Sequence, residues 1–583
     1  MSKDKKKNHQ TAKQNSQKAE RNSGAFTLGD LWPKSPQGPP SVAKAPPKSG
    51  PGTGIPARQP QLAPIGSATQ AGPKESPKVP NKDFATLLKT VNAIDSFNRV
   101  TAAQTAPAGS NQRRKDYQTQ IENSQSRQQA HQATALDVIV GLDLGTGFTK
   151  VVWRDADADK AHILCFGTNP SVIEDYLLPS VVAFDGTFFA AGSDVEPFLK
   201  KSPKAERFSN FKMCLACVSG KSVECGLQRC PLAHWRPVLS QHVSEEEAVE
   251  IVTSLHIGKV IALSRGLIAR HFAEQGINSP IRYTFNMAAP VDHVDDEDVV
   301  RAFDRVLKTG YFMADVFDEK GGPRGLDDLL DCYRTAREFA LKRKVDCFVI
   351  PEVGAEVASM YMSRSARDGL YAFIDIGAGT VDVNFFRMYA GAEGRQISFY
   401  SAGVIKRGAA HLEAIASRQL AEQSSGWFRL LKEKKEGAAT TTFPTSAEAK
   451  EFLKRAAEWI SDEVESGVRH VSAEGFPKEM NHDEWKRLVL ILGGGGANLT
   501  TYKDASRKGV SLLAPNLAAE PLPVPTDLSL KALPSSEFAR FAVAYGLSFN
   551  LANLPVFNMP KDVDADKPLA RKVAPENPTP DVG

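Results

Sequence analysis

One pattern occurs twice in the chain, and this repeat constrains the fold more than any other feature of the sequence. The segment IVGLDLGTGFTK at residues 139–150 and the segment YAFIDIGAGTVDVNFF at residues 371–386 both run from apolar residues into Asp-x-Gly-x-Gly. Asp143 matches Asp375 with an offset of 232 residues, and the glycines that follow keep that offset. Internal repetition of this kind indicates two related lobes.

Each copy predicts a strand, a glycine turn and a second strand, because β-favouring residues follow the glycines (FTKVVW and TVDVNFF). A dinucleotide-binding fingerprint would instead turn into a helix. A glycine turn presents backbone N–H groups without side-chain obstruction, and such concavities bind phosphate. Two facing turns would grip a polyphosphate, and the aspartate before each turn would hold a hydrated Mg²⁺ or orient water.

A third glycine cluster fits the same site. The segment LVLILGGGGANLT at residues 488–500 predicts a buried strand that ends in four glycines. Glycines at a strand end permit the close approach of a flat ligand such as adenosine. We therefore expect this cluster, represented by Gly493, Gly494 and Gly495, to line the nucleotide.

Composition divides the chain into regions. Residues 1–135 are rich in Gln, Ser, Pro, Ala and Lys and predict disorder, residues 136–550 interleave strand-like and helix-like segments and predict an α/β fold, and residues 551–583 predict a flexible tail. Residues 83–100 place apolar side chains on one helical face, which favours either a helix that binds a protein partner or one that packs on the body.

Charge and hydropathy narrow the function classes. The formal net charge of +4 gives no support for nucleic-acid binding. The sequence shows no apolar run of membrane-spanning length and no secretory signal, so we expect a cytoplasmic protein.

At this point the sequence resembles the actin, sugar-kinase and heat-shock-chaperone ATPase superfamily. The closest likeness is to the nucleotide-binding domain of DnaK-type seventy-kilodalton chaperones, carried by GLDLGTGFTK, FIDIGAGTVDV, VIPEVGAEVASMY, GVIKRGAAHLEAI and FARFAVAYGLSF in consistent order over residues 137–550. The resemblance implies duplicated ribonuclease-H-like lobes, at 136–360 and 361–550, with Mg-ATP in the cleft between them. No peptide-binding domain follows residue 550, so a complete chaperone cycle on exposed peptides is not supported. We expect a nucleotide switch that acts on a protein partner.

The resemblance also implies roles for individual residues. Asp143 and Asp375 would organise Mg²⁺ and its waters, Lys212 would neutralise the terminal phosphate, and Glu352 or Asp375 would orient the attacking water. Lys150 stands where actins carry their phosphate lysine. The remaining residues expected to line the nucleotide are Gly145, Thr146, Gly147, Gly377, Ala378, Gly379, Thr380 and Gly408. The arginine that stacks on adenine in the family corresponds here to Ala497, which is a departure from the pattern.

Four cysteines crowd into a 17-residue stretch, as C-x2-C-x7-C-x4-C at Cys214, Cys217, Cys225 and Cys230. Four thiolates with one C-x2-C pair suit a closed tetrahedral zinc site. Iron–sulfur ligation, redox thiols and unligated cysteines remain as alternatives.

The resulting hypothesis is a two-lobed ATPase switch. A filament-forming actin-like protein, a small-molecule kinase on the same scaffold and a nucleotide-binding scaffold without turnover remain as alternatives. A kinase would need a dedicated base and a substrate pocket, which no motif in the sequence identifies.

Overall fold

Two mixed β-sheets organise the part of the chain that the computed structural model describes, and they confirm the predicted α/β class. The first sheet has seven strands, the second has six, and a smaller antiparallel sheet has three. The described residues are 110–129, 135–220, 243–290, 297–317, 322–323, 325–361, 367–391, 394–411, 447–479, 481–515, 517–550, 554–558 and 560–563.

The first sheet is centred on β1 (Leu136–Leu144) and has the order β15-β3-β2-β1-β8-β9, with β4 paired to β2. β1 pairs antiparallel with β2 and parallel with β8. The other strands are β2 (Phe148–Asp155), β3 (Lys160–Ile163), β4 (Leu178–Pro179), β8 (Ile281–Ala289), β9 (Cys347–Pro351) and β15 (Leu528–Ser529).

The second sheet repeats this arrangement in the order β14-β13-β10-β11-β12-β16. Its central strand β10 pairs antiparallel with β11 and parallel with β13, as β1 does with β2 and β8. The repeat in the sequence is therefore accompanied by a repeat in topology. The strands are β10 (Gly369–Ile376), β11 (Val381–Gly391), β12 (Gly394–Ile405), β13 (Val489–Gly493), β14 (Ala519–Glu520) and β16 (Val556–Asn558).

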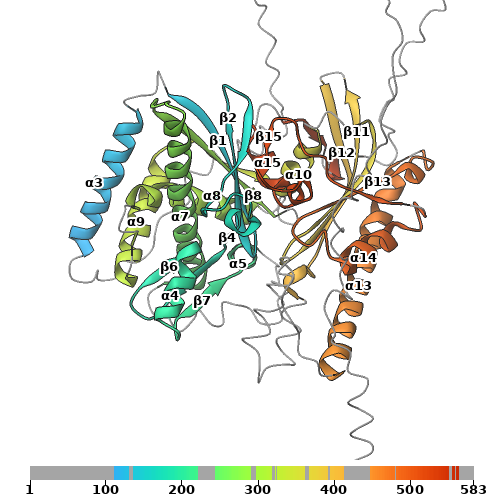
Figure 1. Ribbon diagram of the computed structural model, residues 1–583, viewed down its shortest axis with the longest axis horizontal. Helices are drawn as coiled ribbons and strands as arrows, with labels where there is room; N and C mark the ends of the chain where they lie inside the picture. Colours follow the sequence, from blue (N-terminus) through green and yellow to red (C-terminus); the bar gives the residue numbers. More distant parts are fainter. Residues whose placement is uncertain are drawn as a thin grey trace, which may run out of the picture. The chain divides into compact units, whose positions relative to one another are not determined.

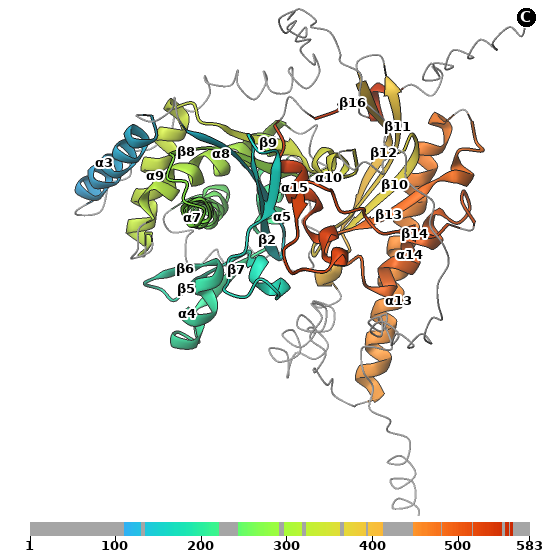
Figure 2. The same ribbon diagram turned by 45° about the horizontal axis from the view of Figure 1, so that its top comes forward.

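Helices cover both sheets and form three main hydrophobic cores. The first core joins the first sheet to α5, α7, α8 and α9, and another joins the second sheet to α13 and α14 (Figures 1 and 2). The third contains residues of both sheets together with α10 and α15. The helices are α3 (Ser110–Gln129), α4 (Val195–Lys201), α5 (Phe211–Ser219), α7 (Glu245–Glu274), α8 (Glu297–Met313), α9 (Leu326–Lys342), α10 (Glu352–Tyr361), α13 (Ala447–Gly475), α14 (Thr500–Val510) and α15 (Ala542–Leu547), and the small sheet comprises β5 (Val181–Phe184), β6 (Phe189–Ala191) and β7 (Glu206–Ser209).

The long helix α7 lies in the first core. Its first turn is capped by Ser244, whose side chain accepts a hydrogen bond from the Glu247 backbone N–H at 3.2 Å. Of the described helices, only α7 is long and apolar enough to cross a bilayer, and 67% of its most apolar window is buried within the protein. A helix that is apolar on most sides suits the interior of a protein as well as a bilayer, so this feature does not establish a membrane span.

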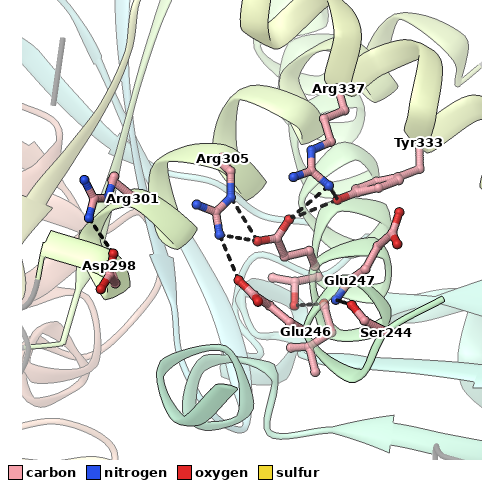
Figure 3. A network of polar contacts seen from close by, with 11 residues as sticks. Ser244, Glu246, Glu247, Asp298, Arg301, Arg305, Tyr333 and Arg337 are labelled. Carbon is pink, nitrogen blue, oxygen red and sulfur yellow. Dashed lines mark hydrogen bonds and ion pairs between the residues drawn. The ribbon is translucent and has the colours of Figure 1, made fainter. Parts of the chain in front are cut away.

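A buried carboxylate ties α7 to the two helices beside it. Glu250 of α7 accepts hydrogen bonds from Arg305 of α8, at 2.9 Å to Nε, and from the hydroxyl of Tyr333 of α9, at 3.0 Å. Arg337 of α9 lies 3.8 Å from the same carboxylate. Figure 3 shows Arg305, Tyr333 and Arg337 converging on the start of α7, whereas Arg301 of α8 points to Asp298. A buried charge satisfied in this way fixes how the helices pack.

The helix α3 corrects the prediction that all of residues 1–135 are disordered. It packs against α9 (Figure 1), with Ile121 fully buried, while Arg113 donates to Asp331 of α9 at 2.8 Å and Tyr117 hydrogen-bonds to Asp328. Residues 1–109, which include the expected partner helix at 83–100, lie outside the described residues.

Two C-terminal predictions also change. The strand β16 pairs in parallel with β12, so the prediction of a flexible tail from residue 551 is wrong for residues 556–558. In addition, β15 belongs to the first sheet, and α15 packs on β1, β2 and α10. The segment from 528 to 547 therefore contributes to the first sheet, although the sequence assigned it to the second lobe.

Candidate functional site

The first glycine turn joins β1 to β2, and it places an acid opposite a lysine. The Gly145 N–H donates to the Asp143 carbonyl at 3.0 Å, and a Cβ at Gly145 would lie 2.4 Å from the Phe148 carbonyl oxygen. Only glycine fits this turn without a backbone shift. Asp143 and Lys150 face each other in the strand register, and Lys150 Nζ lies 2.5 Å from Asp143 Oδ2. The first hairpin thus neutralises its own carboxylate.

The second glycine turn joins β10 to β11 with the same register and a different charge. The Gly377 N–H donates to the Thr380 carbonyl at 2.9 Å. Asp375 faces Asp382 across the pair, and the Thr380 hydroxyl donates to Asp382 Oδ2 at 2.8 Å. Asp382 lies 232 residues after Lys150 and therefore occupies the matching position. Two carboxyl groups stand where the first hairpin has an ion pair.

The turn around Gly408 supports the second hairpin, and Gly408 itself does not line the pocket, although its neighbour Ala409 does. Gly408 donates to the Gly379 carbonyl at 3.0 Å, and Ala410 donates to the Ala378 carbonyl at 2.8 Å. A Cβ at Gly408 would lie 2.5 Å from backbone atoms of Ala378, Gly379 and Thr380. The sequence predicted that Gly408 contacts nucleotide, whereas its backbone holds the hairpin in place.

The glycine end of β13 lies beside Asp375, because β10 and β13 run in parallel with Gly493 opposite Asp375. Gly494 has a φ of +78°, and a Cβ there would lie 2.3 Å from Asp375 Oδ1. The Gly496 N–H donates to the Ile376 carbonyl at 2.9 Å. These glycines allow the strand end to lie against the second hairpin, whereas the predicted close approach of a flat ligand such as adenosine stays a prediction.

One pocket collects most of the predicted residues. From the prediction it contains Asp143, Gly145, Thr146, Gly147, Lys150, Lys212, Glu352, Asp375, Gly377, Ala378, Thr380, Gly494 and Gly495. Gly379, Gly408 and Gly493 lie behind this lining: a Cβ at Gly379 would meet the Met213 sulfur at 2.4 Å, and one at Gly493 would meet the Phe373 ring at 2.8 Å. The sequence therefore identified most of the pocket and also some of its supporting backbone.

A lysine–glutamate pair crosses the pocket between two helices. Lys212 follows the first residue of α5. Glu352 is the first residue of α10, where the resemblance implied that a helix begins. Lys212 Nζ lies 2.5 and 2.6 Å from the two oxygens of Glu352. Burial alone would lower the pKa of Lys212, but the carboxylates of Glu352, Asp143 and Asp382 raise it overall. Lys212 is therefore a fixed cation in the pocket.

The carboxyl groups of the second hairpin, Asp375 and Asp382, are not neutralised by an ion pair of this kind. Burial, with the charges of Glu352 and Asp143 adding to it, raises the pKa of Asp375 to about 7. Burial and the nearby Glu352 and Asp375 likewise raise the pKa of Asp382 well above its usual range. Because these groups interact, they titrate together as a set. Such a set can accept a proton near neutral pH or hold a cation.

Sequence reasoning missed several residues of this region. Asp382 could have been predicted from the sequence, because the repeat offset assigns it to the position that matches Lys150. Glu356, by contrast, was predicted as the alternative to Glu352 for positioning the attacking water, and it lies one turn after Glu352 on α10. No sequence pattern predicted Arg540, which enters the pocket from a short 3₁₀ helix (Ser535–Arg540). Its Nε donates a hydrogen bond to Glu537 at 2.7 Å. The other unpredicted lining residues are Phe148, Leu177 and Ala409, whereas Gly496 is the fourth glycine of the predicted cluster.

The predicted zinc cluster is described only in its first half. Cys214 and Cys217 lie three residues apart on α5, where Cys214 is fully buried and Cys217 is partly buried. Cys225 and Cys230 lie outside the described residues. The zinc site stays a prediction.

No protein-family model matches the chain, and no curated protein sequence matches it significantly. Function must therefore be argued from the pocket itself.

Proposed function

We propose that the pocket binds Mg-ATP and that the protein hydrolyses it to ADP and phosphate, as a two-lobed actin-like ATPase that resembles the nucleotide-binding domain of DnaK-type chaperones. The observation that carries this proposal is the convergence of both hairpins, the glycine end of β13 and two lysines on one pocket. The matching strand order of the two sheets supports the proposed duplication.

The pocket residues fit a magnesium-bound polyphosphate. Glycines at 145 and 377 keep side chains away from the turns, and Lys150 and Lys212 supply positive charge. Asp143 and Asp375 would hold the Mg²⁺ through its waters, and the metal would neutralise charge that develops on the phosphate oxygens. The crowded carboxyl groups of the second half favour a cation in this region, because they raise one another's pKa.

Hydrolysis requires that water attack the terminal phosphorus, that the bond to the ADP oxygen break, and that the water lose a proton. Asp375 suits the role of proton acceptor, because its pKa of about 7 lies near the working pH. Glu352 is held by Lys212 at 2.5 Å and suits the role of positioning residue. Lys150 and Lys212 would stabilise the charge of the transferring phosphoryl group.

The test is steady-state phosphate release by the full chain. We expect Asp143→Ala and Asp375→Ala each to lower turnover by about 10²-fold or more, on the scale of lost electrostatic stabilisation. Asp157→Ala, in the exposed turn after β2, is the matched control and should keep the wild-type rate. Wild-type turnover in both pocket variants would refute the assignment. ATP consumption that requires an added sugar would instead indicate a kinase.

The proposed output is a change in affinity for a protein partner that binds the N-terminal arm, including residues 83–100. Affinity capture with and without ATP, comparing the full chain with one that lacks residues 1–109, tests this step. The truncation should end before α3, because Ile121 of α3 is fully buried. Partner capture that is unaffected by the truncation would show that the arm is not the binding element.

A further inference from the structure

Three carboxyl groups meet at the junction of α10 and β10. Glu352 and Glu356 lie one turn apart on α10, and Asp375 lies near the end of β10. One ligand oxygen from each lies within 4.8 Å of the others. Two ligands on opposite sides of a Ca²⁺ ion are separated by about 4.6–5.2 Å, so a single cation of this kind could contact all three.

Glu356 supplies a second and independent observation. Its side chain is fully buried, and its Oε1 has no hydrogen-bond partner among the described residues. Its Oε2 has only a long contact of 3.5 Å, from the side-chain amide of Asn384. The Asn384 Oδ1 is also buried and unpartnered. Buried acceptors without donors are rare in proteins, and each needs a missing partner to explain it.

The lysines of the pocket do not supply that partner. Lys150 is paired with Asp143 and Lys212 with Glu352, so both ammonium groups are already engaged. Among the described residues no ion pair joins a basic side chain to Glu356. Five carboxyl groups, at positions 143, 352, 356, 375 and 382, therefore gather around two ammonium groups. The three carboxyl groups in excess must hold protons or bind a cation, and one divalent cation neutralises two of them.

We propose that Glu352, Glu356 and Asp375 bind one divalent cation directly, in the absence of nucleotide. All three ligands are carboxylates, which select hard, oxygen-preferring cations such as Mg²⁺, Mn²⁺ and Ca²⁺ over thiolate- or imidazole-preferring metals. Glu356 does not line the open pocket, so this cation is distinct from a metal that arrives with a polyphosphate. The Glu352 oxygens can serve both Lys212 and the cation, because each oxygen has two lone pairs.

The test is a titration of the full chain with Mn²⁺ and no nucleotide, with free Mn²⁺ measured by electron paramagnetic resonance. We expect one Mn²⁺ per chain for the wild type, and an affinity at least tenfold weaker for Glu356→Gln. The matched control, Glu206→Gln on the exposed edge of β7, should bind as the wild type does. Failure of the wild type to bind Mn²⁺ would overturn the proposal, and so would unchanged binding by Glu356→Gln.

Thermal unfolding separates lost binding from lost folding. Glu356→Gln removes a buried carboxyl group that lacks a partner, so without metal it should unfold at the wild-type temperature or above. Mn²⁺ should raise the unfolding temperature of the wild type and leave that of Glu356→Gln unchanged. Stabilisation by K⁺ without any effect of Mn²⁺ would contradict the divalent assignment. These results do not depend on ATP, so they can fail while the proposed ATPase stands.

Discussion

The two glycine hairpins have the same strand register and differ in charge at one matched position. In the first, Asp143 faces Lys150 and the pair lies 2.5 Å apart; in the second, Asp375 faces Asp382, and the pKa of both acids is raised. The first hairpin is therefore electrostatically complete by itself. The second needs positive charge from elsewhere, which Lys212 supplies in part. The difference shows that two hairpins with the same register can have different electrostatic roles. The first provides a fixed ion pair, and the second provides carboxyl groups that can bind a cation.

The largest effect on the free energy of unfolding should come from replacing the lysine that pairs with a carboxylate in each half. Lys212→Met leaves Glu352 without its partner and removes a positive charge near Asp382, and loss of one member of a buried ion pair costs about 3–5 kcal/mol. Lys150→Met affects chiefly Asp143, and the Lys150 side chain is the more exposed, at 17% against 11%. We expect a smaller loss there, of about 1–2 kcal/mol. Urea unfolding without ligand measures both, and equal losses would contradict the proposed division.

Neutralising the two matched aspartates should change stability in opposite directions. Asp143→Asn leaves Lys150 without its carboxylate and should lower the free energy of unfolding by about 2 kcal/mol. Asp375→Asn removes one negative charge from a crowded set, so at pH 8 it should leave that free energy unchanged or raise it by up to about 1 kcal/mol. Equilibrium unfolding in urea at pH 8 compares them directly. Destabilisation of the same size in both variants would mean that the two halves are electrostatically alike.

The matched turn glycines should differ for steric reasons. A Cβ at Gly145 would lie 2.4 Å from the Phe148 carbonyl oxygen, whereas one at Gly377 would lie 3.2 Å from the Thr380 carbonyl oxygen. Overpacking against backbone costs about 1–3 kcal/mol, so Gly145→Ala should lose about 1–2 kcal/mol and Gly377→Ala less than about 1 kcal/mol. Thermal unfolding of the two variants checks this order. A larger loss for Gly377→Ala would show that the second turn is the tighter one.

The smallest expected effect is a pH dependence confined to the second half. The pKa of Asp375 is about 7 in the folded state and about 4 when unfolded, so the folded state holds its proton more tightly. The resulting stabilisation is fully present below about pH 4 and is lost as the pH rises through about 7. Because Asp375 is partly exposed, we expect a total loss of less than about 1 kcal/mol between pH 5 and pH 8. Unfolding of the wild type and of Asp375→Asn from pH 5 to pH 8 isolates this contribution, and parallel profiles would contradict it.

Much of the pocket could be predicted because local pattern determines it. Asp-x-Gly-x-Gly after an apolar run specifies a strand and a tight turn, and the constant offset relates Asp143 to Asp375. These features depend on neighbours in the sequence, so the sequence alone reveals them. The position of Glu352 at the start of α10 was predicted from the resemblance to the ATPase superfamily and not from a local pattern.

The rest depends on contacts between distant segments. Arg540 enters the pocket from a short helix whose sequence carries no phosphate-binding pattern, and β15 joins the first sheet from position 528. The helix α3 was read as disordered because its composition is polar. It docks through charged contacts such as Arg113 to Asp331, with Ile121 as its fully buried apolar anchor. Burial of an isolated apolar residue leaves little periodicity for sequence analysis to detect.

The central claim is that both hairpins and the glycine end of β13 enclose a nucleotide, and calorimetric titration of the full chain with Mg-ATP tests it most directly. We predict one ATP per chain, with affinity at least tenfold weaker for Gly495→Val. That side chain would project into the pocket, while a Cβ at 495 would meet only the Arg540 guanidinium, at 3.2 Å. Gly266→Val on α7, where a Cβ would meet nothing within 4 Å, is the control and should bind ATP normally. Absence of binding by the wild type at millimolar ATP, or normal binding by Gly495→Val, would contradict the account.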